Sequence, residues 1–178
     1  ARFGQEFPLL VKFIDAREDL SIQVHPDDEL ARKRHGKSGK CEMWYVLEAE
    51  PGASLLTGFS RPIAPAEYER RVADNTLTDV LNRQAIASGD VFYLPAGRVH
   101  SIGKGSFIVE IQQSSDITYR IYDFDRRDAA GNSRELHTEL AREAIDFESS
   151  ENSRITYAPE NNQEVRLVTT PYFTTSLY

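Results

Sequence analysis

A mainly β fold, a jelly roll of two packed sheets with a few short helices, is the fold class that this 178-residue sequence predicts. Short apolar runs recur along the chain, and turns containing Gly and Pro separate them. Residues 106–112 alternate between apolar and polar side chains. Side chains two apart on a strand point to the same face. One face is apolar and the other polar: Phe107, Val109 and Ile111 against Glu110 and Gln112. The polar face indicates a lined cavity inside the fold.

The same signals predict the remaining elements in order. We expect strands at 9–15, 20–25, 42–48, 53–58, 91–95, 106–112 and 117–124 and near the end of the chain. We expect helices at 26–34, 65–73, 77–82 and 138–145. The first strand is apolar apart from Lys12 and reads as largely buried. Pro26 and the acids after it favour a helix start, Gly36 can end that helix, and Thr76 with Asp79 fits a capping pattern.

Composition narrows the classes of protein. The chain is 40% hydrophobic and 28% charged, which indicates one globular, soluble domain over residues 1–178. It contains no apolar run of about 18 residues, so we expect no membrane partner. One cysteine cannot form an internal disulfide, which favours a reducing, cytoplasmic location. The net charge of −7 without a basic cluster argues against nucleic acid, so an anionic substrate would need a local pocket of Lys and Arg.

The ends of the chain indicate a piece of a larger protein. The first residue is Ala1, and the last segment stops in what resembles a strand. We interpret the chain as a fragment of a longer one that carries a second β-rich region. Residues 148–163, rich in Glu, Ser and Asn, read as a surface loop.

Four residues have the types and spacing of a metal site built on strands. Gln23 and His25 are two apart and share a strand face, Glu42 begins the next apolar run, and His100 ends a G-x5-P-x-G-x2-H pattern. Two imidazoles and two oxygen ligands suit Zn²⁺, and iron, manganese or cobalt would also fit. The alternatives are structural: His25 could cap the following helix, and His100 could be a hydrogen-bonded surface residue.

The other candidate ligands favour structural roles. His35 ends a predicted helix, where a histidine suits the helix dipole. His137 precedes a helix and could at most line the site. Cys41 is adjacent to Glu42 and therefore points to the opposite face, where we expect a small core residue.

Four charged residues are expected on the metal face. Lys40 shares the face of Glu42, Lys12 interrupts an apolar strand, and Asp116 and Arg120 share strand parity. Each could form a structural salt bridge, for example Asp116 with Arg120. Together they would surround the metal with three cations and one carboxylate. That set suits a phosphorylated sugar, because cations hold phosphate.

At these residues the chain resembles the type I mannose-6-phosphate isomerases (phosphomannose isomerases), zinc-dependent members of the cupin superfamily. The resemblance lies in Leu-Ser-Ile-Gln-Val-His-Pro-Asp (20–27), Lys-Cys-Glu-Met-Trp-Tyr (40–45), Gly-Asp-Val-Phe-Tyr-Leu-Pro-Ala-Gly-Arg-Val-His (89–100), Gln-Gln-Ser-Ser-Asp-Ile-Thr-Tyr-Arg (112–120) and Arg-Glu-Leu-His (134–137). It covers about residues 8–147. By that resemblance the fold is a cupin-type double-stranded β-helix, and the metal ligands are Gln23, His25, Glu42 and His100.

The resemblance also implies a reaction and roles in it. The family interconverts mannose 6-phosphate and fructose 6-phosphate by a proton shift between C1 and C2 through a cis-enediol. Lys12, Lys40, Asp116 and Arg120 match polar active-site positions. We assign Arg120 and Lys12 to the enediolate charge or the phosphate, and Lys40 and Asp116 to acid–base work. We expect a monomer or homodimer that takes a phosphorylated hexose.

Two departures from the family pattern stand out. Gly39 occupies a position where members often carry His before the active-site Lys, which removes one acid–base candidate. The short separation between His25 and Glu42 resembles the compact bacterial form and suggests a more open site. Two other functions stay open: a non-catalytic cupin that binds a sugar phosphate, and a cupin oxidoreductase using Fe²⁺ and O₂. The Gln ligand and the clustered Lys and Arg argue against the second.

Overall fold

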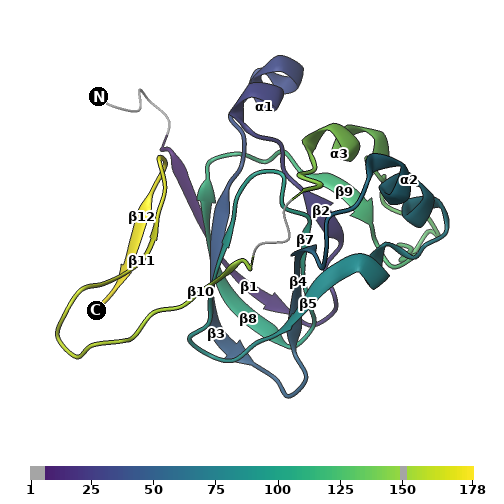
Figure 1. The fold of residues 1–178 in the computed structure, drawn as a ribbon. Helices are drawn as coiled ribbons and strands as arrows, with labels where there is room; N and C mark the ends of the chain where they lie inside the picture. Colours follow the sequence, from purple (N-terminus) through teal and green to yellow (C-terminus); the bar gives the residue numbers. More distant parts are fainter. Residues whose placement is uncertain (1–6, 149–151) are drawn as a thin grey trace.

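Two five-stranded antiparallel sheets form a jelly roll in the computed structural model, which describes residues 7–148 and 152–178 (Figure 1). The first sheet has the order β1-β8-β3-β6-β10 and the second β5-β4-β7-β2-β9. The strands are β1 (Leu9–Ala16), β2 (Ile22–Val24), β3 (Glu42–Ala49), β4 (Ser54–Phe59), β5 (Leu81–Ala85), β6 (Val91–Leu94), β7 (His100–Ile102), β8 (Ser106–Gln113), β9 (Tyr119–Tyr122) and β10 (Arg154–Ile155). The expected mainly β jelly roll is confirmed.

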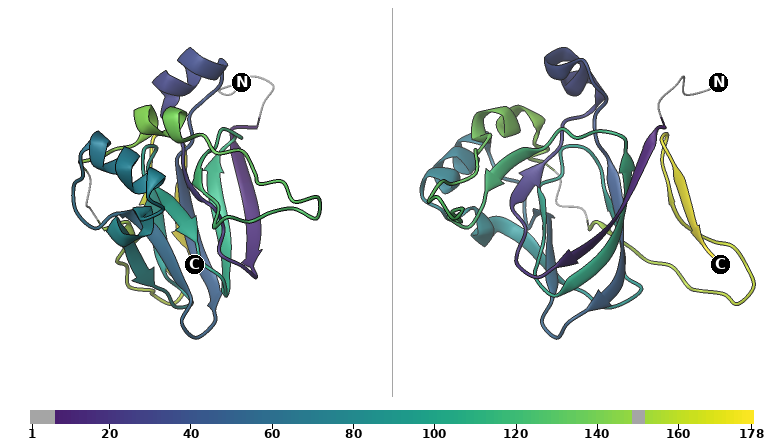
Figure 2. Two further views of the ribbon diagram at one scale, coloured as in Figure 1. Left: turned by 90° about the vertical axis from the view of Figure 1, so that its right-hand side faces the viewer. Right: turned by 180° about the vertical axis from the view of Figure 1, so that it is seen from behind.

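Three helices, a 3₁₀ turn and a hairpin complete the part of the chain that the structure describes. They are α1 (Asp28–His35), α2 (Pro65–Ala73), α3 (Thr138–Ala144), the turn Leu77–Val80, and the hairpin of β11 (Val165–Thr169) and β12 (Thr174–Leu177). Figure 2 shows α1 standing above one end of the barrel and the hairpin lying beside it, with α2 and α3 on another side. The helix expected from Pro26 begins two residues later, at Asp28, where the capping residue Asp27 accepts a hydrogen bond from the Leu30 amide. Gly36 ends it as expected and is left-handed.

Apolar packing is divided among three clusters. One fills the space between the sheets around Trp44, Phe92 and Ile108. A second lies behind β2 and β9, where α2 and α3 cover it, and includes Tyr68. The third joins the outer side of the first sheet to the hairpin through Met43 and Phe173. At the end of the barrel below α1, buried polar side chains lie in place of an apolar cluster.

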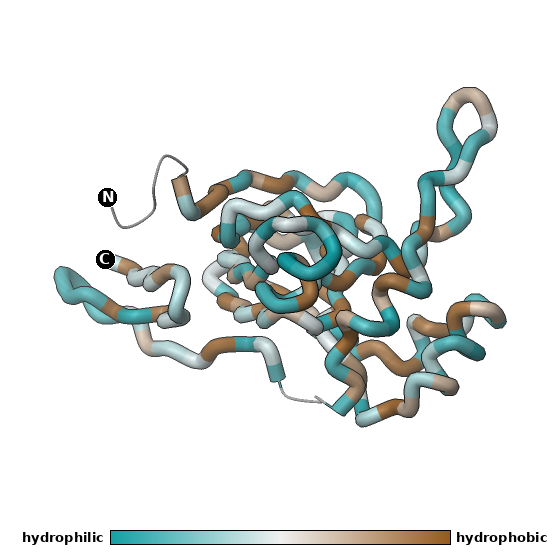
Figure 3. The backbone as a smooth tube through the Cα atoms, turned by 90° about the horizontal axis from the view of Figure 1, so that it is seen from above, coloured by the Kyte–Doolittle hydropathy of each residue, from teal (hydrophilic) through white to brown (hydrophobic). Residues whose placement is uncertain are grey.

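The structure corrects several expected elements. The first strand is not largely buried, because Val11 is 52% and Phe13 69% exposed at the sheet edge. Apolar residues therefore also occur along β1, the edge strand beside the N-terminus (Figure 3). The 77–82 helix shortens to the 3₁₀ turn, Thr76 makes no capping bond, and β5 follows directly. The expected strand 117–124 shrinks to β9, and β7 was not expected.

The C-terminal third differs from expectation in one place. The surface loop expected at 148–163 contains β10, which pairs with β6; residues 149–151 lie outside the described part. The final segment ends in a strand as expected: this is β12, which pairs with β11 in a hairpin. Among the described residues, no helix is long and apolar enough to cross a membrane.

Candidate metal centre

Three predicted ligands from different parts of the chain converge at the end of the barrel below α1. His25 follows β2 and His100 begins β7 in one sheet, whereas Glu42 begins β3 in the other. The His25 Nε2 atom lies 3.5 Å from Glu42 Oε2, and the His100 Nε2 atom lies 3.3 Å from Glu42 Oε1. The possible ligand atoms of all three lie within 4.8 Å of one another, and all three side chains are buried.

Backbone carbonyls fix which nitrogen of each histidine faces the centre. The His25 Nδ1 atom lies 2.8 Å from the Ile117 oxygen, and the His100 Nδ1 atom lies 2.7 Å from the Arg98 oxygen. Each Nδ1 must therefore carry the proton and donate it, which leaves a lone pair on each Nε2. This is the outer contact that orients metal-binding histidines in proteins. The turn before His100 also contacts His25, because the Gly97 amide donates a hydrogen bond to the His25 carbonyl over 2.9 Å.

The facing atoms are left without hydrogen bonds. Both Nε2 atoms and both carboxylate oxygens of Glu42 are buried and have no hydrogen-bond partner. Lys40 Nζ does lie 2.9 Å from Glu42 Oε2 as an ion pair, but not in hydrogen-bond geometry. An imidazole lone pair aimed at a carboxylate is repelled by it unless a cation lies between them. Buried polar groups without hydrogen-bond partners are also rare in proteins. The donor set therefore fits a divalent ion such as Zn²⁺.

Gln23, the fourth predicted ligand, is on the correct face. Its strand register places it directly opposite His100 on β7 and opposite Arg120 on β9. Residues directly opposite one another in antiparallel strands point to the same side of the sheet. The half-buried Gln23 side chain therefore shares the face of His100, which is consistent with a fourth ligand.

Electrostatics keep the ligands in the states that a metal needs. Burial lowers the pKa of His25 to about 4 and also lowers the pKa of His100, so both imidazoles are neutral near pH 7. Burial alone would raise the pKa of Glu42, but His100, Lys40 and His25 outweigh it and hold that pKa well below its usual range. A neutral imidazole and an ionised carboxylate are the forms that coordinate metal ions.

A second buried carboxylate, Glu110, lies beside the centre. It accepts hydrogen bonds from Lys12 Nζ at 2.8 Å and from Trp44 Nε1 at 3.0 Å, and Lys40 Nζ lies 3.9 Å away. Lys12 also donates to Gln112. The sheet register explains the group, because Lys12 and Trp44 both pair with Glu110 across β1, β8 and β3. The expected polar face of residues 106–112 is thus confirmed.

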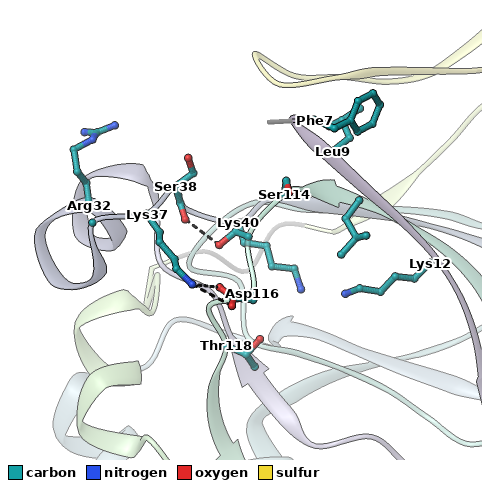
Figure 4. A pocket seen from close by; sticks show the side chains of 13 residues that line it. Phe7, Leu9, Lys12, Arg32, Lys37, Ser38, Lys40, Ser114, Asp116 and Thr118 are labelled. Atoms are coloured by element: carbon teal, nitrogen blue, oxygen red, sulfur yellow. Dashed lines mark hydrogen bonds and ion pairs between the residues drawn. The ribbon is translucent and has the colours of Figure 1, made fainter. Parts of the chain in front are cut away.

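A basic pocket of about 960 Å³ opens from this cluster toward α1. Its cationic lining comes from Lys12, Arg32, Lys37 and Lys40, and Asp116 is its one carboxylate. In Figure 4 the Lys12 and Lys40 side chains point toward each other inside the pocket, while Lys37 reaches across to Asp116. The protein carries a net charge of −7, so an anion can bind only where the local charge is positive. The pocket provides such a region.

Asp116 and Arg120 have partners outside the ligand cluster. Asp116 precedes β9, is exposed, and pairs with Lys37 over 2.9 Å, so the considered pair with Arg120 does not form. Arg120 lies on β9 opposite Gln23 and donates to Ser21 Oγ and to the Glu135 carbonyl. Both remain predictions as site residues.

The three residues for which the sequence favoured structural roles make structural contacts in the fold. His35 ends α1 with its Nε2 atom 2.8 Å from the Tyr119 hydroxyl. His137 precedes α3 and accepts a hydrogen bond from the Arg120 amide. Cys41 is buried in the outer cluster, away from Glu42, and burial raises the pKa of its thiol to about 11.

Some residues of the site were not named as candidates from the sequence. Glu110 was placed only on a polar face, although its isolation within an apolar alternation was a usable signal. Arg32 and Lys37 carry no such signal, because they sit in a charged helix and loop whose orientation depends on tertiary packing.

Comparisons with known proteins point to one family of isomerases. Residues 1–60 match the family described as phosphomannose isomerase type I, catalytic domain. The chain is 40% identical over 169 residues to a mannose-6-phosphate isomerase of Streptococcus mutans, covering 94% of the chain and 53% of that protein. It is 43% identical over 147 residues to mannose-6-phosphate isomerase ManA of Bacillus subtilis, covering 82% of the chain and 46% of that protein.

Solved structures give the same result. The mannose 6-phosphate isomerase from Bacillus subtilis superposes with a TM-score of 0.88 at 35% identity, over 96% of this chain and 55% of that one. A phosphomannose isomerase from Salmonella typhimurium, 14% identical with a TM-score of 0.69, shares the fold; the match covers 98% of this chain and 64% of that one.

The fold and the ligand cluster define a cupin-type β protein with a candidate metal centre. Along nearly its whole length, the chain resembles the type I phosphomannose isomerases in sequence and structure. It spans about half the length of the curated relatives that it matches.

Proposed function

We propose that this chain forms the active-site part of a metal-dependent aldose–ketose isomerase that interconverts mannose 6-phosphate and fructose 6-phosphate. The observation that carries the proposal is the set of four buried atoms of His25, Glu42 and His100 that face one another without hydrogen bonds, beside a basic pocket. The substrate is inferred from the relatives, which are named mannose-6-phosphate isomerases.

His25, Glu42, His100 and Gln23 would hold the metal, with Zn²⁺ the ion that best suits the donors. When bound, such an ion supplies a fixed positive charge that polarises substrate oxygens. The chain's own residues do the rest. The pocket cations Lys12, Arg32 and Lys37 provide charge-assisted hydrogen bonds of the kind that hold a phosphate ester.

The reaction moves a proton between neighbouring carbons, so a group must take it from one carbon and return it to the other. Lys40 and Asp116 remain our acid–base candidates. The geometry favours Lys40, because its ammonium is 5% exposed, lies at the ligand cluster and faces two carboxylates. Asp116 is at the rim and pairs with Lys37. Arg120 and Lys12 are assigned to the developing enediolate charge or the phosphate.

One preparation can test the proposal in two ways. Metal analysis should find about one divalent ion per chain, and a coupled assay should detect fructose 6-phosphate formed from mannose 6-phosphate. His100→Ala should lose both, whereas His35→Ala, at the end of α1, should keep both. Full turnover by a metal-free His100→Ala protein would refute the proposal. Metal and sugar-phosphate binding without conversion would instead favour the non-catalytic alternative.

A further inference from the structure

The loop that carries Lys40 is held in place by contacts outside any sheet. Between α1 and β3, the amides of three successive residues are each bonded to a different partner. Gly39 N–H donates to Asp28 Oδ1 over 2.8 Å, Lys40 N–H to the Pro26 carbonyl over 3.1 Å, and Cys41 N–H to Gln113 Oε1 over 2.8 Å. The backbone position of Lys40 therefore depends on these contacts, together with the Gln113 amide, which donates to the Cys41 carbonyl over 3.2 Å.

Asp28 is the residue on which several of these contacts meet. Besides Gly39, its Oδ1 atom accepts from Gln113 Nε2 over 3.2 Å, so it also orients the amide that holds Cys41. Its Oδ2 atom accepts the Tyr172 hydroxyl over 2.8 Å, which connects the loop to the turn of the β11–β12 hairpin. Burial raises the pKa of Asp28, but the bonds from Tyr172, Gly39 and Gln113 outweigh it and lower that pKa.

The close approach of the loop to the helix gives independent support. A Cβ atom on Gly39 would lie 2.4 Å from the Asp27 carbonyl carbon and 2.5 Å from the Asp28 nitrogen. Real Cβ contacts are not this short, and the obstacle is backbone, which cannot rotate away. The absence of a side chain at this position is thus required by the way the start of α1 packs on the loop.

We propose that Asp28 is a positioning residue for the site: it locks the Gly39–Cys41 loop against α1 and the C-terminal hairpin, and so fixes Lys40 beside Glu42 and Glu110. In its effect on catalysis the inference rests on the proposed isomerase function. In its effect on the loop it does not, and the two parts can be measured separately.

The test compares Asp28→Ala, Asp28→Asn and the matched control Asp27→Ala. Alanine at 28 removes all the side-chain contacts of Asp28. Asparagine keeps an oxygen for Gly39 and Gln113 and can donate its amide to the Tyr172 oxygen. Asp27→Ala removes the cap of the same helix, which Asp27 provides to the Leu30 amide over 2.8 Å, without touching the loop.

Two measurements need no substrate. Hydrogen exchange of the amides of residues 39–41 should become about tenfold faster in Asp28→Ala, the equivalent of one lost hydrogen bond. The buried Lys40 amine should also become faster to acylate, as read by mass spectrometry. Asp28→Asn should restore both rates, and Tyr172→Phe should show a smaller change in the same direction. Wild-type rates in Asp28→Ala, or equal loosening in Asp27→Ala, would overturn the proposal.

Turnover tests the catalytic part. If the wild type is an isomerase, kcat should fall between about tenfold and a hundredfold in Asp28→Ala, because small misplacements of reacting groups are costly. Asp28→Asn should recover most of it. A loosened loop with unchanged kcat would overturn the positioning role. An inactive wild type would refute the isomerase function, while the exchange and acylation results would still decide whether Asp28 fixes Lys40.

Discussion

Two buried carboxylates in this molecule have opposite surroundings. Asp123, 5% exposed, accepts hydrogen bonds from Arg134 through both oxygens and from Arg126 as well. Glu42, fully buried, has an ion pair with Lys40 but no hydrogen bond on either oxygen, and two imidazole lone pairs face it. Both carboxylates stay ionised, but only Asp123 has all the partners it needs within the chain.

The difference separates a structural group from a binding group. A buried charge that the protein fully satisfies contributes to holding a loop, here residues 123–134. A buried charge left without hydrogen bonds is destabilising unless something outside the chain completes it. The orientation of His25 and His100 by backbone carbonyls supports our proposal that the missing partner is a cation. The following variants test this contrast.

Glu42→Gln should have the largest effect, and it should fall on metal affinity. The amide cannot supply the charge that a divalent ion requires, so we expect affinity for Co²⁺ or Zn²⁺ to fall at least about a hundredfold. The stability of the metal-free protein should change by less than about 1 kcal/mol, because the loss of the buried Lys40 ion pair is offset by the removal of a carboxylate that has no hydrogen bonds. Calorimetric titration and denaturant unfolding measure the two. A large loss of metal-free stability with unchanged affinity would reverse the contrast.

Asp123→Asn should show the opposite pattern. Removing this charge leaves Arg126 and Arg134 without their buried partner, and we expect the free energy of unfolding to fall by about 1–3 kcal/mol after allowance for their partial exposure. Metal affinity should be unchanged. Asp125→Asn, an exposed change in the same loop, is the matched control and should be nearly neutral.

The Asp123 contribution should depend on pH with a definite sign. Burial raises the pKa of Asp123, but the bonds from Arg134 and Arg126 outweigh it and lower that pKa below its usual value. A lowered folded-state pKa gives stability that is complete above about pH 4, the unfolded value, and is lost as pH falls through the folded value. The difference in unfolding free energy between wild type and Asp123→Asn should therefore be constant from pH 5 to 7 and shrink below about pH 4. A difference that grew on acidification would contradict the assignment.

Lys37→Ala should have the smallest effect on stability. Its pair with Asp116 is exposed, so the free energy of unfolding should change by less than about 0.5 kcal/mol. Because Lys37 lines the basic pocket, we expect KM for the sugar phosphate to rise several-fold. Lys33→Ala, an exposed change on α1 outside the pocket, makes the same change in net charge and should leave KM unaltered. Equal effects of both would mean that only the global charge matters.

The sequence predicted the elements whose signals are local. The start of α1 just after Pro26, its stop at Gly36, and the alternation of 106–112 were all visible as residue types at fixed spacings. The convergence of His25, Glu42 and His100 was predicted from strand positions and from the pattern ending at His100. Lys12 and Lys40 were placed correctly on the polar face because the same parity applies.

The errors arose where tertiary contacts decide. Val11 and Phe13 look buried in sequence, but they lie on the edge strand, and the edge is set by sheet order. β10 exists only because β6 offers it a partner. The considered pair of Asp116 with Arg120 does not form, because Asp116 lies before the start of β9 at Tyr119 and pairs with Lys37 instead. Asp28 and Tyr172 are 144 residues apart, so no local pattern could have joined them.

The most direct measurement is a crystal structure of the protein with zinc, with anomalous diffraction at the zinc edge. We predict one strong peak at about 2.0–2.2 Å from the Nε2 atoms of His25 and His100 and from a Glu42 oxygen, with both Nδ1 atoms still on their carbonyls. A peak elsewhere, or a fully ordered cluster that stays without zinc at saturating concentration, would contradict the claim that these side chains form a metal centre.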